Sequence, residues 1–267
     1  KSLRALNDVA GSHPIDVSPT LLAAHVVPPE FKSDLDGYVD LICNEIVPIV
    51  HEYKLAESFD VFHDDAAFNS QQTAKMFKSA QQCGFSLRIH ADQFYDGGGA
   101  SLAAEHQAIS ADHMDYTTDT GFAELSNAGV SLNLLPGAVF FLGLDQYASG
   151  RTAIDCGCNV ALSTDFNPGS SPSQSLPMMM TLACLKMGIS EDEALWACTM
   201  GAARVIDRHD KIGALDMGFQ ADICLWDAED VAFIPYSYAN LIPDYVFKKG
   251  KLVTNHGVLI SREGQVE

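Results

Sequence analysis

Five ionisable residues of the sequence directly follow short apolar runs that are typical of buried strands. They are His25, Asp64, His90, His113 and Asp165. In a parallel sheet or barrel the carboxyl ends of the strands face one rim, where ligands bind. Imidazole and carboxylate groups are ligands for zinc and iron, so their convergence at such a rim would allow metal-assisted chemistry. Each residue alone is also consistent with a hydrogen-bonded side chain at a strand end.

The residue types suggest a role for each group. His90 is a candidate metal ligand, and His113 is a second ligand or a proton carrier beside a metal-activated water. Asp165 is a candidate ligand and a candidate base for that water. The alternatives are that His113 pairs with Asp112 and that Asp165 begins a turn. Gln93 lies three residues after His90 and is placed to reach the same ligand.

Two loops next to these residues are rich in glycine or polar side chains. Backbone N–H groups and hydroxyls of loop 166–172 are suited to hold a small carboxylate, although the loop is equally consistent with a simple connection. Glycines 97–99 precede a predicted helix. They lack the lysine of a P-loop and the spacing of a dinucleotide fingerprint, so they are interpreted as the lead-in to that helix.

The elements that must position these groups alternate between strands and helices. Apolar runs predict six strands, at 17–24, 59–62, 85–89, 111–114, 130–134 and 159–163. Helical periodicity predicts helices at 2–9, 34–53 with a kink at Pro48, 70–83 with Ser70 as N-cap, 100–109 and 118–128. This order predicts an α/β fold with a parallel sheet, either doubly wound or part of a (β/α)8 barrel.

The pattern changes after about residue 205. Residues 214–227 predict a turn and a strand, and residues 244–253 predict a hairpin around Lys249 and Gly250. The predicted organisation is therefore a barrel domain at 1–205 and C-terminal β elements at 206–267 that form a small β layer.

The composition excludes some classes of partner. Sixteen basic and 35 acidic side chains give a net charge of −19. A surface this acidic repels phosphate backbones and anionic lipids, so we expect neither nucleic acid nor membrane as a partner. The seven cysteines are odd in number and mostly lie in apolar segments, which predicts reduced thiols in a cytoplasmic protein. Since the helix predicted at 2–9 begins directly after Lys1, we expect that the N-terminal part of a longer protein is absent.

Several segments together resemble a known family. The order His90, His113, Asp165 at strand ends is similar to that of the amidohydrolase superfamily of metal-dependent (β/α)8 barrels. More narrowly, the segments 20–30, 89–93, 111–116, 134–138 and 163–170 resemble the imidazolonepropionase family, which opens the imidazolone ring in histidine degradation. The resemblance extends from Lys1 to about Val253. It implies a TIM-like barrel, with about six of the eight barrel strands in this chain, and a small β-sandwich layer.

The resemblance also implies roles and a reaction. The reaction would be hydrolysis of 4-imidazolone-5-propanoate to N-formimidoyl-L-glutamate by a homodimer with one Zn or Fe ion per chain. His113 would stabilise the developing oxyanion and would do so best when protonated. The implied metal ligands are His90 and Asp165, the implied catalytic residues are Asp165, His113 and Gln93, and the implied substrate contacts are His25, Gln93, Asn167, Gly169 and Ser170.

One departure from the family pattern leaves alternatives open. The family carries an HxH pair at its first barrel strand, and this sequence contains no HxH. Another amidohydrolase, such as a heterocycle deaminase, or a non-catalytic fragment without these ligands, are the alternatives. An open arc of six strands would also expose an uncovered apolar interior.

Overall fold

The computed structural model describes residues 1–260 of the chain, which divide into two compact units. Unit 1 consists of Lys1–Leu132 with Thr152–Asn159. Unit 2 consists of Asn133–Arg151 and the chain from Val160 onward. Each unit is described by itself below. The boundary near residue 205, which was expected from the sequence, stays a prediction.

All six strands expected for the main sheet are present. They are β1 (Thr20–Ala24), β2 (Ser58–His63), β3 (Ser86–Ala91), β4 (Ser110–His113), β5 (Ser131–Leu134) and β6 (Val160–Leu162). They form one sheet in the order β1-β2-β3-β4-β5-β6, and the pairs from β1 to β4 are parallel. This is the strand order of a (β/α) barrel wall, so the predicted fold class is confirmed.

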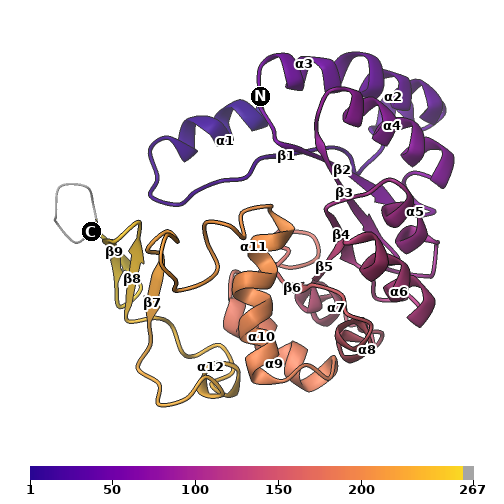
Figure 1. Ribbon diagram of the computed structural model, residues 1–267. Helices are drawn as coiled ribbons and strands as arrows, with labels where there is room; N and C mark the ends of the chain where they lie inside the picture. The colour runs from indigo at the N-terminus through magenta and orange to yellow at the C-terminus, as the bar shows by residue number, and fades with distance from the viewer. Residues whose placement is uncertain (261–267) are drawn as a thin grey trace. The chain divides into compact units, whose positions relative to one another are not determined.

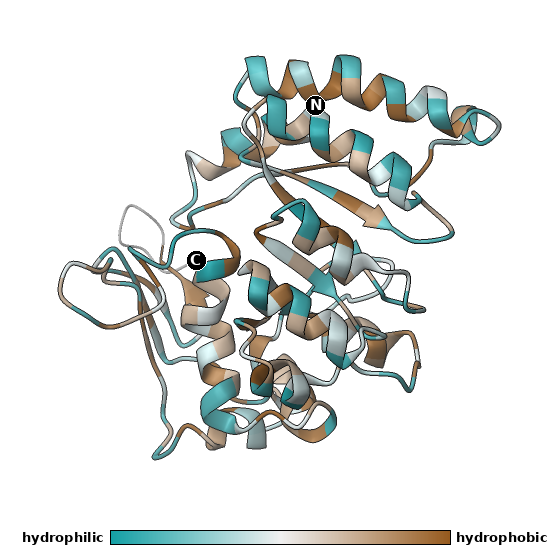
Figure 2. Ribbon diagram, turned by 45° about the vertical axis from the view of Figure 1, so that its right-hand side comes forward, coloured by the Kyte–Doolittle hydropathy of each residue, from teal (hydrophilic) through white to brown (hydrophobic). Residues whose placement is uncertain are grey.

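Helices follow the strands of unit 1, as the alternating pattern predicts (Figure 1). Helix α4 packs against β2 and β3, and helix α5 packs against β3 and β4. Figure 2 shows teal and brown residues along the same helices, as expected where one helix face is buried. The helices are α1 (Ser2–Ala10), η1 (Pro29–Phe31), α2 (Leu35–Leu41), η2 (Ile42–Ile46), α3 (Val47–Glu52), α4 (Ser70–Gln82), α5 (Gly99–Glu105) and α6 (Asp119–Ala128).

Two details of these helices differ from the sequence prediction. Helix α4 begins at Ser70, as expected, but Asn69 rather than Ser70 is its N-cap. The Asn69 side chain accepts from the N–H of Gln72, whose side chain in turn accepts from the N–H of Asn69, which forms a capping box. The helix predicted at 34–53 contains the π-helical turn η2, which passes directly into α3, and Pro48 is the second residue of α3.

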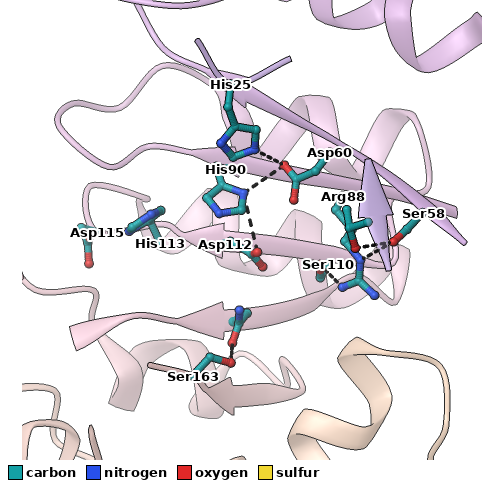
Figure 3. Close-up of polar contacts among 12 residues, drawn as sticks. His25, Ser58, Asp60, Arg88, His90, Ser110, Asp112, His113, Asp115 and Ser163 are labelled. Atoms are coloured by element: carbon teal, nitrogen blue, oxygen red, sulfur yellow. Dashed lines mark hydrogen bonds and ion pairs between the residues drawn. The ribbon is translucent and has the colours of Figure 1, made fainter. Parts of the chain in front are cut away.

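The sheet of unit 1 has one apolar and one polar face. Leu87, Ile89 and Ala91 are buried on the face of β3 that α4 and α5 cover. The alternate residues of β3, Arg88 and His90, lie on the other face and align with polar neighbours on β2 and β4. Arg88 donates from Nε to Ser58 Oγ at 3.1 Å and from a terminal nitrogen to Ser110 Oγ at 3.0 Å (Figure 3). The expectation of an apolar interior is therefore wrong for this part of the sheet.

Unit 2 contains helices and a second sheet. Helix α9 packs against α7, α10 and α12, and strand β6 packs against η3 and α11. Its helices are α7 (Pro136–Phe141), α8 (Gly150–Asp155, whose last four residues belong to unit 1), α9 (Leu176–Lys186), α10 (Glu191–Trp196), η3 (Ala197–Gly201), α11 (Ala202–Val205) and α12 (Phe233–Tyr236). The second sheet is antiparallel in the order β10-β9-β8-β7, from β7 (Ile223–Leu225), β8 (Tyr245–Lys248), β9 (Lys251–Asn255) and β10 (Val258–Leu259).

The predicted hairpin around Lys249 and Gly250 is confirmed. Both residues have positive φ, of 52° and 74°, and they connect β8 to β9. The seven cysteines are all free within the described chain. No helix among residues 1–260 combines the length and the apolar character that a membrane crossing requires.

The side chain of Asp222 forms hydrogen bonds with this hairpin. Its substitution should therefore change how the free energy of unfolding depends on pH. Its carboxylate accepts from Lys248 Nζ, from the N–H of Lys249 at 2.9 Å and from Gln220 Nε2 at 2.7 Å. Burial raises the pKa of Asp222, but these donors outweigh burial and lower its pKa overall. Since the folded pKa is depressed, the stabilisation is complete above the ordinary carboxyl pKa of about 3.9 and is lost as the pH falls below it.

We therefore expect Asp222→Asn to lower the free energy of unfolding by about 1–2 kcal/mol at pH 7. The difference from the wild type should shrink below about pH 4. Denaturant unfolding at pH 7 and below about pH 4 measures this difference. Asp210→Asn is the control, because Asp210 is exposed and forms a long ion pair with Lys211. A difference that is constant with pH would contradict the assignment.

Candidate metal and catalytic site

Two candidate site histidines of unit 1, His25 and His90, contact one carboxylate. Asp60 Oδ1 lies 3.1 Å from His25 Nε2 and 2.9 Å from His90 Nδ1 (Figure 3). The two imidazole rings stand nearly perpendicular, with centroids 4.6 Å apart. The side chain of Asp60 is only 3% exposed, whereas those of His25 and His90 are 21% and 16% exposed. The carboxylate is therefore buried, whereas the two imidazole rings remain partly exposed to solvent.

The charge of Asp60 is stabilised by these rings. Burial raises the pKa of Asp60, but the charge of His90 and the hydrogen bonds from His25 and His90 outweigh it and hold the pKa well below its ordinary value. Asp112 adds a second carboxylate, with Oδ2 3.7 Å from His90 Nδ1. The alternative pairing of Asp112 with His113 is not observed, since His113 Nδ1 lies 3.8 Å from Asp115 instead.

His113 completes the group of rings, with its centroid 5.4 Å from that of His90. Its backbone is in the left-handed region at φ 72°, which is costly for a residue with a side chain. Its buried Nδ1 has no hydrogen-bond partner within residues 1–260. Burial, followed by repulsion from His90 and His25, holds the pKa of His113 well below its ordinary value. This shift favours the neutral ring at neutral pH, and the expected role of His113 as an imidazolium stays a prediction.

The loop after β3 is organised by Asp92, which the sequence did not single out. Asp92 Oδ1 accepts from the N–H groups of Gly97 and Gly99, both at 3.0 Å, and Oδ2 accepts from Thr117 Oγ1 at 2.8 Å. Glycines 97–99 lead into α5 as predicted, and two of their three N–H groups hold this carboxylate of the same chain. Gln93 follows directly and is buried.

Asp64 does not join the group of rings. Its Oδ1 accepts from the N–H of Ala66 at 3.0 Å, within its own turn. The preceding His63 is buried, and its ring nitrogens face the carbonyl oxygens of Phe68 and Gly97 at 3.0 and 3.1 Å. Both residues therefore organise the loop after β2.

Asp165 belongs to unit 2, where it begins a tightly closed loop. Its φ is 50°, again in the left-handed region. Asn167 Oδ1 accepts from the N–H groups of Gly169 and Ser170, both at 2.8 Å, and Asn167 Nδ2 donates to the carbonyl of Asp165 at 2.7 Å. Two N–H groups that were candidates for holding a carboxylate are thus used within the loop. Substrate contacts of Asn167, Gly169 and Ser170 stay predictions, as does a metal ligated by both His90 and Asp165.

Ser170 offers a direct test of the predicted substrate contact. Its Oγ lies 2.9 Å from Asn167 Nδ2 and 3.4 Å from Asp165 Oδ2. If Ser170 contacts the substrate as predicted, we expect Ser170→Ala to raise KM about tenfold with little change in kcat, because such a contact would be made equally in the ground and transition states. Ser173→Ala, in the same loop region but outside this network, is the control. A loss confined to kcat would contradict the binding role.

The donor set fits a metal ion. Within residues 1–260, one group of three potential ligand residues has donor atoms within 4.8 Å of one another, namely His25, Asp60 and His90. Two imidazole nitrogens and a carboxylate oxygen suit zinc and iron. Sequence reasoning missed Asp60 because it lies in the middle of β2 rather than at its end. The available signal was an acidic residue between Phe59 and Val61, since a buried carboxylate requires partners.

Comparison with known proteins identifies the family. Residues 61–253 match the model of the amidohydrolase family. The imidazolonepropionase of Shouchella clausii (strain KSM-K16) is 42% identical over 98% of this chain and 58% of its own length. That of Geobacillus thermodenitrificans (strain NG80-2) is 43% identical over 96% of this chain and 60% of its own length. The chain thus spans about three fifths of these relatives, and the resemblance seen in the motifs is confirmed.

Solved structures show the same fold at low sequence identity. N-isopropylammelide isopropylaminohydrolase from Burkholderia multivorans is 18% identical with a TM-score of 0.75, over 97% of this chain and 68% of that chain. The 5-methylcytosine deaminase from Klebsiella pneumoniae is 17% identical with a TM-score of 0.75, over 98% of this chain and 68% of that chain. The family model and the curated relatives show that the chain belongs to the amidohydrolase family.

Proposed function

We propose that the protein carrying this chain hydrolyses 4-imidazolone-5-propanoate to N-formimidoyl-L-glutamate. The observation that carries the proposal is the identity of 38–43% to imidazolonepropionases over nearly the whole chain. The cluster of His25, Asp60, His90 and His113 supports it, because hydrolysis of a ring amide requires an activated water and a stabilised oxyanion. One water is consumed, and one ring C–N bond is cleaved.

His90 would hold the metal together with further ligands, for which Asp165 stays our candidate. A bound Zn or Fe ion would supply Lewis acidity and a nucleophilic water at neutral pH. Asp165 would take a proton from the attacking water and pass it to the ring nitrogen that leaves. Neutral His113 would donate one N–H hydrogen bond to the carbonyl oxygen as its charge develops. The buried amide of Gln93 and the ring of His25 would hydrogen-bond the imidazolone.

Substrate turnover tests the proposal directly. We expect the purified protein to consume 4-imidazolone-5-propanoate, followed by loss of its ultraviolet absorption, and to lose this activity on dialysis against a chelator. Release of ammonia from an aminated heterocycle without turnover of the imidazolone would instead favour a deaminase. Absence of any turnover with a full metal complement would favour a non-catalytic role.

Other expectations from the sequence stay predictions of this proposal. They are a single Zn or Fe ion per chain, a homodimer, a cytoplasmic location and the absence of nucleic-acid or membrane partners. Metal analysis and the mass of the protein in solution test the first two.

A further inference from the structure

Asp60 occupies a position that none of the expected roles explains. It lies three residues before the end of β2, whereas ligands in such sheets come from the strand ends. Its Oδ1 lies between two imidazole nitrogens of different strands, His25 Nε2 at 3.1 Å and His90 Nδ1 at 2.9 Å. One buried oxygen therefore contacts both rings.

This contact determines where the protons are on the two rings. A carboxylate oxygen only accepts, so each nitrogen that faces it must carry a hydrogen. A lone pair on either nitrogen would face the negative oxygen at about 3 Å and be repelled. A neutral His90 then carries its proton on Nδ1 and its lone pair on Nε2, and a neutral His25 has the opposite arrangement.

We propose that Asp60 is a positioning residue that fixes opposite tautomers of His25 and His90, so that His90 presents Nε2 to a metal ion and His25 presents Nδ1 to the substrate. The inference deepens the proposed function and rests on it for the identity of the metal and the substrate. The nearly perpendicular rings have their donor edges on the same oxygen, so one side chain orients both. A carboxylate behind a ligating histidine also increases the basicity of the ligand nitrogen.

The alternative is that Asp60 is itself a ligand, in one group with His25 and His90. An ion in that position would bind His25 Nε2 and His90 Nδ1, which are the nitrogens that now face Asp60. The two arrangements therefore differ in which nitrogen of each ring loses its proton.

Nitrogen-15 NMR distinguishes a positioning role of Asp60 from a ligand role. The full chain is labelled at its nine histidines and is free of metal. We expect a proton on Nδ1 of His90 and on Nε2 of His25, with signals assigned by His25→Gln and His90→Gln. Addition of Zn²⁺ should shift His90 Nε2 and leave both of these protons in place. A proton on His90 Nε2 in the metal-free chain, or its loss from Nδ1 on adding Zn²⁺, would overturn the proposal.

Two variants separate positioning from mere packing. Asp60→Asn keeps an accepting oxygen and should retain both tautomers, whereas Asp60→Ala should release the tautomer of His25 and lower the affinity for Zn²⁺ roughly 10–100-fold. Release of the His90 tautomer should also require Asp112→Ala, because Asp112 Oδ2 lies 3.7 Å from His90 Nδ1. Chelator competition measures the affinity.

The control is Asp40→Asn, which removes an exposed carboxylate paired with Lys75. It should change neither the histidine tautomers nor the affinity for Zn²⁺. An unchanged tautomer of His25 in a folded Asp60→Ala chain would overturn the proposal. Fixed tautomers without Zn²⁺ affinity would contradict the metal in the proposed function and leave the tautomer assignment standing.

Discussion

Replacement of His90 by alanine should remove the bound metal and lower kcat/KM by more than about 100-fold. The reason is that partners behind a metal ligand already contribute roughly 10–100-fold to metal affinity or activity, and a direct ligand contributes more. His90 is the second-last residue of β3 and lies close to two carboxylates and two other imidazoles. Metal analysis of the purified protein and turnover of 4-imidazolone-5-propanoate measure the two effects.

The matched control is His51→Ala. His51 lies on helix α3 with its ring packed edge-on against Phe85, and its loss should leave metal content and kcat/KM unchanged. Asp165→Asn provides the second arm, because a common ligand role predicts loss of the same metal ion. Full metal occupancy in the His90 variant would contradict the assignment of His90, and full occupancy in the Asp165 variant alone would contradict only that of Asp165.

The sequence predicted the elements of this fold well because their signals are local. Six strands and the hairpin at Lys249 and Gly250 are each encoded within a few residues. The N-cap of α4 was missed by one residue, since Asn69 and Ser70 are both good caps and only the reciprocal bond with Gln72 decides between them.

The candidate site was predictable only in part, for a physical reason. Strand-end histidines are recognisable because the end of an apolar run shows where the rim lies. Asp60 and Arg88 lie within strands, and their roles depend on which residues the neighbouring strands place beside them. The same dependence explains the wrong expectation of an apolar interior, because strand alternation alone does not show which face the helices cover. The lowered pKa of His113 likewise follows from burial and from the rings of His90 and His25, which other parts of the sheet contribute.

Gly99→Ala should be the most destabilising single substitution in the loop that follows the site. A Cβ atom at this position would lie 2.2 Å from the Cβ of Ala91 and 3.0 Å from Asp92 Oδ1, so the backbone must move. That movement breaks the hydrogen bond from Gly99 to the buried Asp92 carboxylate. Overpacking and the lost charge-assisted bond together predict a decrease of about 3–5 kcal/mol in the free energy of unfolding.

The comparison with Gly11→Ala isolates this cause. Gly11 has negative φ, and the nearest atoms to an added Cβ are 3.6 Å away, so its substitution should be neutral or slightly stabilising. Denaturant unfolding of both variants measures the difference. Because Asp92 directly precedes Gln93 and holds the turn after β3, the Gly99 variant should also lose turnover at temperatures where it remains folded. An equal stability of the two variants would show that the Asp92 carboxylate does not require this close approach of the backbone.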